Sequence, residues 1–208
     1  YNRRDVEYLM NKKNKNEIAT SLFWKILENG GSQGVQFIVS ILLARLLSPA
    51  EYGIVAIVLI FTTIANVLVQ NGFSSALIQK QNADDLDFSS VLIFNIFLSI
   101  LIYILLFLIS PAIAGIYNRA ELIKILRVMG IIIIPGSIIS VQNSYVARNM
   151  KFKMLFIATF FASVISGGIS VFMAFSGMKV WALAFQQIVY YFALLIILGI
   201  GIKYFPKL

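Results

Sequence analysis

Long apolar segments separated by short polar linkers form the dominant pattern of this chain. A helix needs about 20 apolar residues to cross roughly 30 Å of hydrocarbon, and six segments are long enough to do so. They comprise residues 21–47, 53–78, 88–117, 123–147, 153–176 and 180–203. Because the linkers are short, successive helices should be antiparallel neighbours. The pattern predicts an all-α polytopic membrane protein.

Polar residues inside these segments recur every three or four positions, which places them on one face of a helix. They are Ser21, Lys25, Glu28, Ser32, Gln36 and Ser40 in the first segment, Thr62, Asn66, Gln70 and Ser74 in the second, Asn95, Ser99 and Tyr103 in the third, Ser137, Ser140, Asn143 and Ser144 in the fourth, and Gln186, Gln187 and Tyr190 in the sixth. Such groups are costly in hydrocarbon, so we expect them to face the bundle interior or a hydrated cavity. The alternative is that they hydrogen-bond between helices without any cargo.

The fifth segment differs, because small residues follow one another there at helical spacing. Ala162, Ser166, Ser170 and Ala174 predict a surface for close helix packing, with Gly167 and Gly168 beside it. This face is predicted to be structural.

Lys25 and Glu28 have several possible roles. At i,i+3 spacing they can pair with each other, and Lys25 can also extend to the lipid headgroups or contact a cargo. Glu28 lies deeper and is the candidate for protonation coupling. Pro135 and Gly136 interrupt the fourth segment, as either a hinge or a static kink.

Composition supports the membrane assignment and removes most enzyme classes. The chain is 60% hydrophobic and 12% charged, whereas soluble domains average about 45–50% and about 25%. It contains no cysteine and no histidine, so thiolate metal sites, histidine bases and the usual zinc and haem ligand sets are excluded. Nucleotide-binding and hydrolase motifs are also missing. We therefore expect no catalysis, no metal and no cofactor.

The distribution of cations predicts the orientation. With the N-terminus inside, eleven Lys and Arg residues lie on the cytoplasmic side and five on the outer side, so both termini are predicted to be cytoplasmic. The net charge of +8 is spread over short loops and tails, which does not favour a nucleic-acid partner. Residues 1–20 are predicted to be a cytoplasmic tail. Met10 is a plausible start, which marks residues 1–9 as a candidate non-native extension.

Three stretches resemble the Wzx-type polysaccharide flippases of the multidrug/oligosaccharidyl-lipid/polysaccharide exporter superfamily. They are "LLARLLSPAEYGIVAIVLIF" (42–61) with "NGFSSALIQK" (71–80), "NSYVARNMKFKMLFIAT" (143–159) and "SGMKVWALAFQQIV" (176–189). The resemblance implies two pseudo-symmetric lobes working by alternating access, of which these six helices would be the N-terminal lobe. It also implies a location in the bacterial inner membrane.

The resemblance further implies a cargo, undecaprenyl-diphosphate-linked oligosaccharide destined for a surface polysaccharide. Lys25 is then the best candidate for the diphosphate, with Arg45 and Arg148 weaker. The candidate sugar-facing groups are Gln36, Asn66, Gln70, Asn95, Gln142 and Asn143. The implied partners are membrane lipids, a C-terminal lobe, a polysaccharide polymerase and glycosyltransferases.

Three alternatives remain open from the sequence. One is a lipid II flippase or multidrug exporter of the same superfamily. The others are a membrane enzyme of the glycan pathway and a membrane scaffold. Short outer loops and the absence of histidine disfavour the enzyme, and the polar helix faces disfavour the scaffold.

Overall fold

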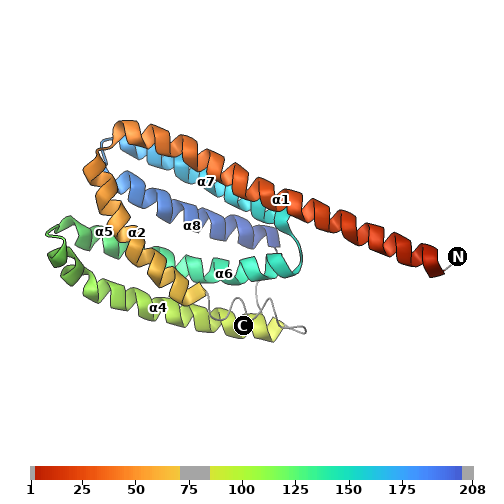
Figure 1. Ribbon diagram of the computed structural model, residues 1–208. Helices are drawn as coiled ribbons and strands as arrows, with labels where there is room; N and C mark the ends of the chain where they lie inside the picture. The colour runs from red at the N-terminus through yellow and green to blue at the C-terminus, as the bar shows by residue number, and fades with distance from the viewer. Residues whose placement is uncertain (1–2, 71–84, 203–208) are drawn as a thin grey trace.

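The computed structural model describes residues 3–70 and 85–202, with side chains at residues 20, 23–69 and 86–202. These ranges form α-helices and one short 3₁₀ turn (Figure 1). The elements are α1 (Arg3–Leu46), α2 (Pro49–Gln70), α4 (Asp85–Ile116), α5 (Glu121–Met129), η1 (Gly130–Ile132), α6 (Ile133–Arg148), α7 (Phe152–Phe175) and α8 (Val180–Ile202). The predicted all-α class is confirmed for the described residues.

Five of the predicted spans are long and apolar enough to cross a membrane. They are Pro49–Val69, Leu86–Ile116, Glu121–Arg148, Phe152–Phe175 and Val180–Ile202. α1 is long enough, but Lys25, Glu28 and several amides make it more polar than the other five. Its crossing of the membrane therefore stays a prediction, and so does the count of six.

Two predicted boundaries shift in the structure. α1 begins at Arg3 rather than at residue 21. α2 begins at Pro49 rather than at residue 53, and the predicted extension over residues 71–78 lies outside the described residues.

A side-chain hydrogen bond at the N-terminus explains the early start of α2. The backbone N–H of Ser48 donates to Glu51 Oε2 at 2.7 Å, and Pro49 occupies the first helical position, where its missing N–H costs nothing. Glu51 therefore has a structural role at this turn.

The helices are arranged as a chain of neighbours. α1 lies along α7 and α7 along α8; α8 contacts α6, and α6 lies along α4. α2 runs obliquely away from α1 after the turn at Ser48 and crosses towards α4 and α6 (Figure 1). One side of α1 is therefore not covered by α2.

The predicted small-residue face of α7 is confirmed as a packing surface, because Ala162, Ser166, Ser170 and Ala174 are all buried. Gly167 lies so close to α1 that a Cβ there would be 2.5 Å from Val39 Cγ2. Gly31 of α1 also lies close to α7, because a Cβ there would be 2.9 Å from the Phe156 ring. These two glycines allow α1 and α7 to approach closely.

The interruption expected at Pro135–Gly136 lies one turn earlier. Both residues are buried inside α6, and the irregular turn is η1 at Gly130–Ile132. The reason is that proline lacks the N–H that would bond the carbonyl four residues before it, so the irregularity falls on the preceding turn. Whether this break is a hinge stays a prediction.

A buried network joins α4 to α5 where Pro111 interrupts α4. Pro111 has no N–H for the Phe107 carbonyl, and Ser110 Oγ donates to that carbonyl at 2.7 Å instead. Arg127 Nε donates to Ser110 Oγ at 2.9 Å, and the guanidinium lies 4.0 Å from the centre of the Phe107 ring. Arg127 is one of the five cations that the sequence predicts on the outer side. Its contacts give it a structural role.

We expect Ser110→Ala to destabilise the fold by about 1–3 kcal/mol, because it removes the hydrogen bonds of two groups at a buried position. The matched control is Ser90→Ala, where an exposed hydroxyl on the same helix donates to the Leu86 carbonyl at 2.8 Å. That change should stay within about 0.5 kcal/mol. Thermal unfolding in detergent measures both, and equal shifts would disprove the network.

Candidate functional site

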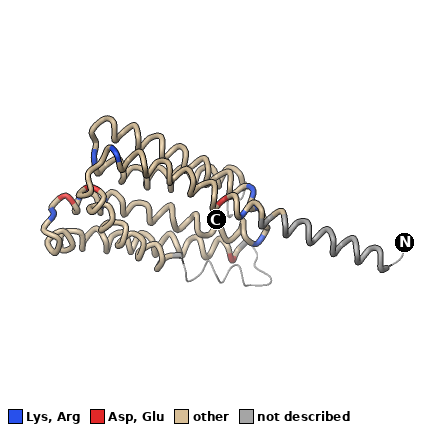
Figure 2. The backbone as a smooth tube through the Cα atoms, turned by 45° about the horizontal axis from the view of Figure 1, so that its top comes forward, with Lys and Arg blue, Asp and Glu red and all other residues tan. Residues whose placement is uncertain are grey.

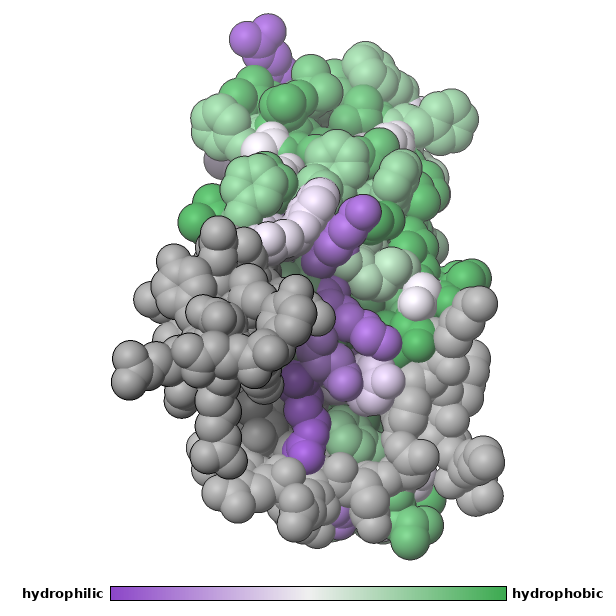
Figure 3. Space-filling model, turned by 90° about the vertical axis from the view of Figure 1, so that its right-hand side faces the viewer, coloured by the Kyte–Doolittle hydropathy of each residue, from purple (hydrophilic) through white to green (hydrophobic). Residues whose placement is uncertain are grey.

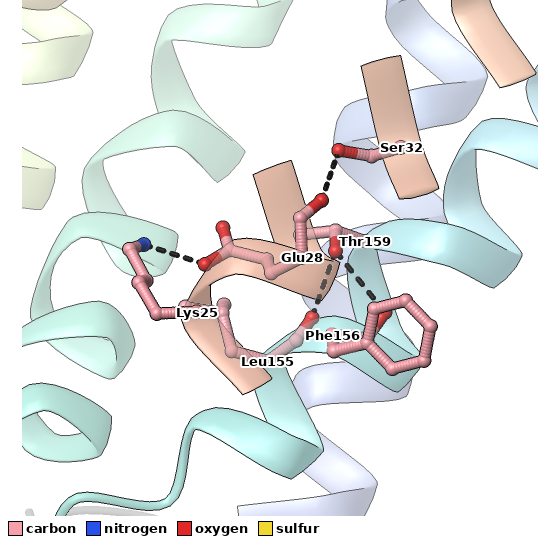
Figure 4. Close-up of polar contacts among 6 residues, drawn as sticks. All are labelled: Lys25, Glu28, Ser32, Leu155, Phe156 and Thr159. Atoms are coloured by element: carbon pink, nitrogen blue, oxygen red, sulfur yellow. Dashed lines mark hydrogen bonds and ion pairs between the residues drawn. The ribbon is translucent and has the colours of Figure 1, made fainter. Parts of the chain in front are cut away.

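The charged pair predicted on α1 is present. Lys25 Nζ lies 2.5 Å from Glu28 Oε2, and Ser32 Oγ donates to the Glu28 carbonyl at 2.6 Å (Figure 4). The Glu28 side chain is 12% exposed and the Lys25 side chain 43%. The carboxylate is thus largely enclosed, while the ammonium keeps an open side for a further anion.

Residues of α7 and α8 hold this pair in place. The Lys25 ammonium lies 5.9 Å from the centre of the Phe152 ring, and Glu28 is within electrostatic range of Tyr190. The contact of Gly31 with Phe156 brings α1 close enough to α7 for these neighbours to meet. Residues at the start of α7 and in the middle of α8 therefore set the position of one lysine on α1.

The polar positions of α1 continue from this pair along one side of the helix. We call Lys25, Glu28, Ser32, Gln36 and Ser40 the α1 stripe. Gln36 and Ser40 are exposed, and Ser40 lines a pocket together with residues of α2 and α8. At 1.5 Å per residue, the stripe is about 23 Å long. It runs along α1 from the Lys25–Glu28 pair to the pocket that residues of α2 and α8 line.

That pocket has a volume of about 210 Å³. Its polar groups come from Ser40, Tyr52, Gln186 and Gln187, and its apolar wall includes Leu43, Leu59 and Leu183. The sequence predicts Gln186 and Gln187 on a polar face of the last helix, but it does not place them among the candidate site residues. Tyr52 gave no signal in the sequence, because only the packing of α2 against α8 brings it there.

Asn66 and Asn95 lie elsewhere, inside the bundle. Asn66 is 8% exposed, and Asn95 is fully buried. The residues of α4 just before Asn95 pack on Val141 of α6. Leu98, which follows Asn95 on α4, packs near Ile133 of α6. Asn95 therefore lies where α4 meets α6. Neither asparagine is part of the α1 stripe. The side chain of Gln70 lies outside the described residues.

In the described part of the chain, the amide oxygens of Gln142 and Asn143 are buried without a hydrogen-bond partner. The same holds for both the oxygen and the nitrogen of the Asn95 amide. Gln142 faces α8, because a Cβ on Gly199 would lie 3.4 Å from its Nε2. Arg148 is partly buried and already engaged with other groups. The structure thus brings Lys25, Glu28 and Gln36 together on one helix and distributes the other candidates over α2, α4 and α6.

Charged residues gather at the two ends of the bundle, and the middle is uncharged among the described residues (Figure 2). At the end that contains Lys25, Lys153 lies 5.5 Å from the Trp24 ring and Lys151 lies 5.4 Å from the Tyr145 ring. Figure 3 shows a hydrophilic band across this end. Cations stacked on aromatic rings between apolar surfaces are typical of a membrane interface.

The α1 stripe carries groups that can bind an anion and polar groups. Over residues 3–70 and 85–202, no group of three His, Cys, Asp or Glu side chains is placed to hold a metal ion. One half-open ammonium, held by an enclosed carboxylate and followed by hydroxyl and amide groups, suits an anion joined to a neutral polar chain.

Comparison with known proteins agrees with this picture. The model of a family described as polysaccharide biosynthesis protein matches residues 42–208. The succinoglycan biosynthesis transport protein ExoT of Rhizobium meliloti is 26% identical over 85% of this chain and 36% of its own length. The teichuronic acid biosynthesis protein TuaB of Bacillus subtilis is 29% identical over 67% of this chain and 29% of its own.

A further relative is the lipopolysaccharide biosynthesis protein WzxC of Escherichia coli, 22% identical over 49% of this chain and 21% of its own length. The chain thus spans about a third or less of these relatives. No solved structure matches it. Because the family model covers most of the chain, this multi-pass membrane protein belongs to the polysaccharide biosynthesis protein family.

Proposed function

We propose that this chain is the N-terminal lobe of a flippase of the bacterial inner membrane. Its cargo is an undecaprenyl-diphosphate-linked oligosaccharide, which it moves from the cytoplasmic to the outer leaflet for surface polysaccharide synthesis. A second lobe completes the transporter, and transport proceeds by alternating access without a catalytic step. In this proposal α1 crosses the membrane as the sixth spanning helix.

The observation that carries this proposal is the uncovered α1 stripe. A helix face that carries a charged pair followed by Ser32, Gln36 and Ser40 is a poor lipid-facing surface, because such groups are costly in hydrocarbon. α2 leaves this side open, which is the arrangement expected when another lobe and a hydrated pathway lie against it.

The chemistry of the stripe matches the proposed cargo. An ammonium at the membrane interface attracts a diphosphate more strongly than in bulk water, because the surroundings are less polarisable. Glu28 pairs with Lys25 and restricts the position of its ammonium, since the carboxylate itself is largely enclosed. Amide and hydroxyl groups both donate and accept hydrogen bonds, as sugar hydroxyls do.

Charge also supports the proposed orientation. Lys25 and Lys153 lie against aromatic rings of α7 and α1, and Lys151 and Arg148 follow at the turn from α6 to α7. We place this end of the bundle at the cytoplasmic surface. The cargo would then be met first at Lys25, where its diphosphate is present before translocation. Both termini are cytoplasmic in this arrangement.

Deleting the gene in its own host tests the proposal. We expect loss of the surface polysaccharide together with accumulation of the lipid-linked oligosaccharide in the inner membrane, because synthesis continues while export stops. Loss without accumulation would point to an enzyme of the pathway. Unchanged polysaccharide, combined with rescue of cells lacking the lipid II flippase, would assign the chain to peptidoglycan precursors instead.

A further inference from the structure

The pocket between α1, α2 and α8 has the composition of a sugar site. Two amides, Gln186 and Gln187, face it beside the Tyr52 phenol. Neither amide has a hydrogen-bond partner within the described ranges, although both are only partly exposed. Partly buried amides normally find partners, so two that remain free at one pocket leave donors and acceptors available for a ligand.

The lining also excludes other ligands. Among the residues that line the pocket none is charged, so neither a phosphate nor a cation finds a counter-charge there. Leu43, Leu59 and Leu183 form an apolar wall that suits the C–H faces of a sugar ring, and Tyr52 adds an aromatic ring. The volume of about 210 Å³ accommodates one monosaccharide and not a whole oligosaccharide. A neutral ring with several hydroxyl groups fits these conditions.

The pocket also lies at a defined distance from Lys25. Ser40 and Lys25 are fifteen residues apart on α1, which is about 23 Å along the helix axis. Tyr52 and Gln186 lie within the first two turns of α2 and α8, so the pocket is near the end of the bundle opposite Lys25. An oligosaccharide several sugars long, with its diphosphate at Lys25, reaches this point.

We propose that this pocket binds one uncharged monosaccharide of the cargo, distant from the diphosphate. Gln186 and Gln187 recognise its hydroxyl groups, and Tyr52 packs on the ring. This inference rests on the proposed function and adds a second contact, so that the two ends of the α1 stripe hold the two chemically different parts of one molecule.

Two probes separate the two ends of the stripe. One is undecaprenyl diphosphate without sugar, and the other is one repeating unit of free oligosaccharide cut from the surface polysaccharide of the same cells. The chain in lipid nanodiscs should bind both. The double variant Gln186→Leu/Gln187→Leu should lose about tenfold or more in affinity for the oligosaccharide, about 1.4 kcal/mol, and keep its affinity for undecaprenyl diphosphate. Lys25→Ala/Glu28→Gln should show the reverse.

Leucine is close to glutamine in size and is a good helix former, so the double variant should fold, which circular dichroism checks. Gln33→Leu, at an exposed position on α1 outside the pocket, is the matched control and should bind both probes normally. A pocket variant that binds the oligosaccharide normally, or loses both probes equally, would overturn the inference. If the wild-type chain binds undecaprenyl diphosphate but not the oligosaccharide, the pocket is not a sugar site and the proposed function still stands. If the wild-type chain binds neither probe, both the sugar site and the proposed function are contradicted.

Discussion

The double variant Lys25→Ala/Glu28→Gln is expected to reduce export of the surface polysaccharide by about 10- to 100-fold at normal protein levels. A hydrogen bond to a charged group is worth about 1.5–3 kcal/mol, and the variant removes the ammonium that we assign to the diphosphate. Both residues are changed because Lys25→Ala alone would leave the enclosed Glu28 carboxylate without its partner, which is itself destabilising. Quantifying surface polysaccharide per cell measures the effect.

This design separates a binding role of Lys25 from a structural one. If Lys25 only neutralises Glu28, the double variant removes both members of the pair and export returns to normal, which would contradict the assignment. Lys153→Ala is the matched control, because it removes one cation at the same end, where Lys153 lies against Trp24, which is not a member of the α1 stripe. We expect its export to remain close to that of the wild type.

Replacing Gly167 with alanine is expected to destabilise the chain by about 1–3 kcal/mol, the usual range for overpacking. The added methyl group would meet Val39 Cγ2 at 2.5 Å, and a β-branched side chain on a helix has little freedom to move away. Gly168→Ala is a stringent control, because nothing lies within 4 Å of a Cβ there. It should be neutral or stabilising by up to about 1 kcal/mol through helix propensity.

The apparent Tm of the two variants in the same detergent decides this prediction, since the neighbouring substitutions are chemically identical. Adding Val39→Ala to Gly167→Ala should recover part of the loss, because the new methyl group then occupies the space left by the valine. Equal Tm values for the two alanine variants, or no recovery in the double variant, would show that α1 and α7 do not pack as closely as the structure indicates.

The prediction of most spanning segments followed from one physical property. Hydrocarbon length and backbone hydrogen bonding force a helix onto any apolar run of sufficient length, so local composition was enough for α4 to α8. α2 begins before the predicted span at residue 53, because the hydrogen bond from Ser48 to Glu51 stabilises its first turn. The irregular turn η1 lies just before Pro135, since proline leaves the carbonyl four residues earlier without its helical hydrogen bond.

The candidate site was predicted less completely. Helical spacing placed Lys25, Glu28 and Gln36 on one face, because that face is a property of α1 alone. Spacing could not separate Asn95, which is buried between α4 and α6, from residues that line an open surface. It also could not assemble Tyr52, Gln186 and Gln187 into a pocket, since these belong to helices far apart in sequence.

By itself, the sequence determined that this protein is a helical membrane protein, which residues share a helix face, and where cations concentrate. These properties depend on the membrane solvent and on the 3.6-residue period, both of which act locally. Only the tertiary structure decided that α1 packs on α7 through Gly31 and Gly167 while α2 turns away from it. That choice depends on side-chain fit between distant segments, and it determines which polar residues remain open to a cargo.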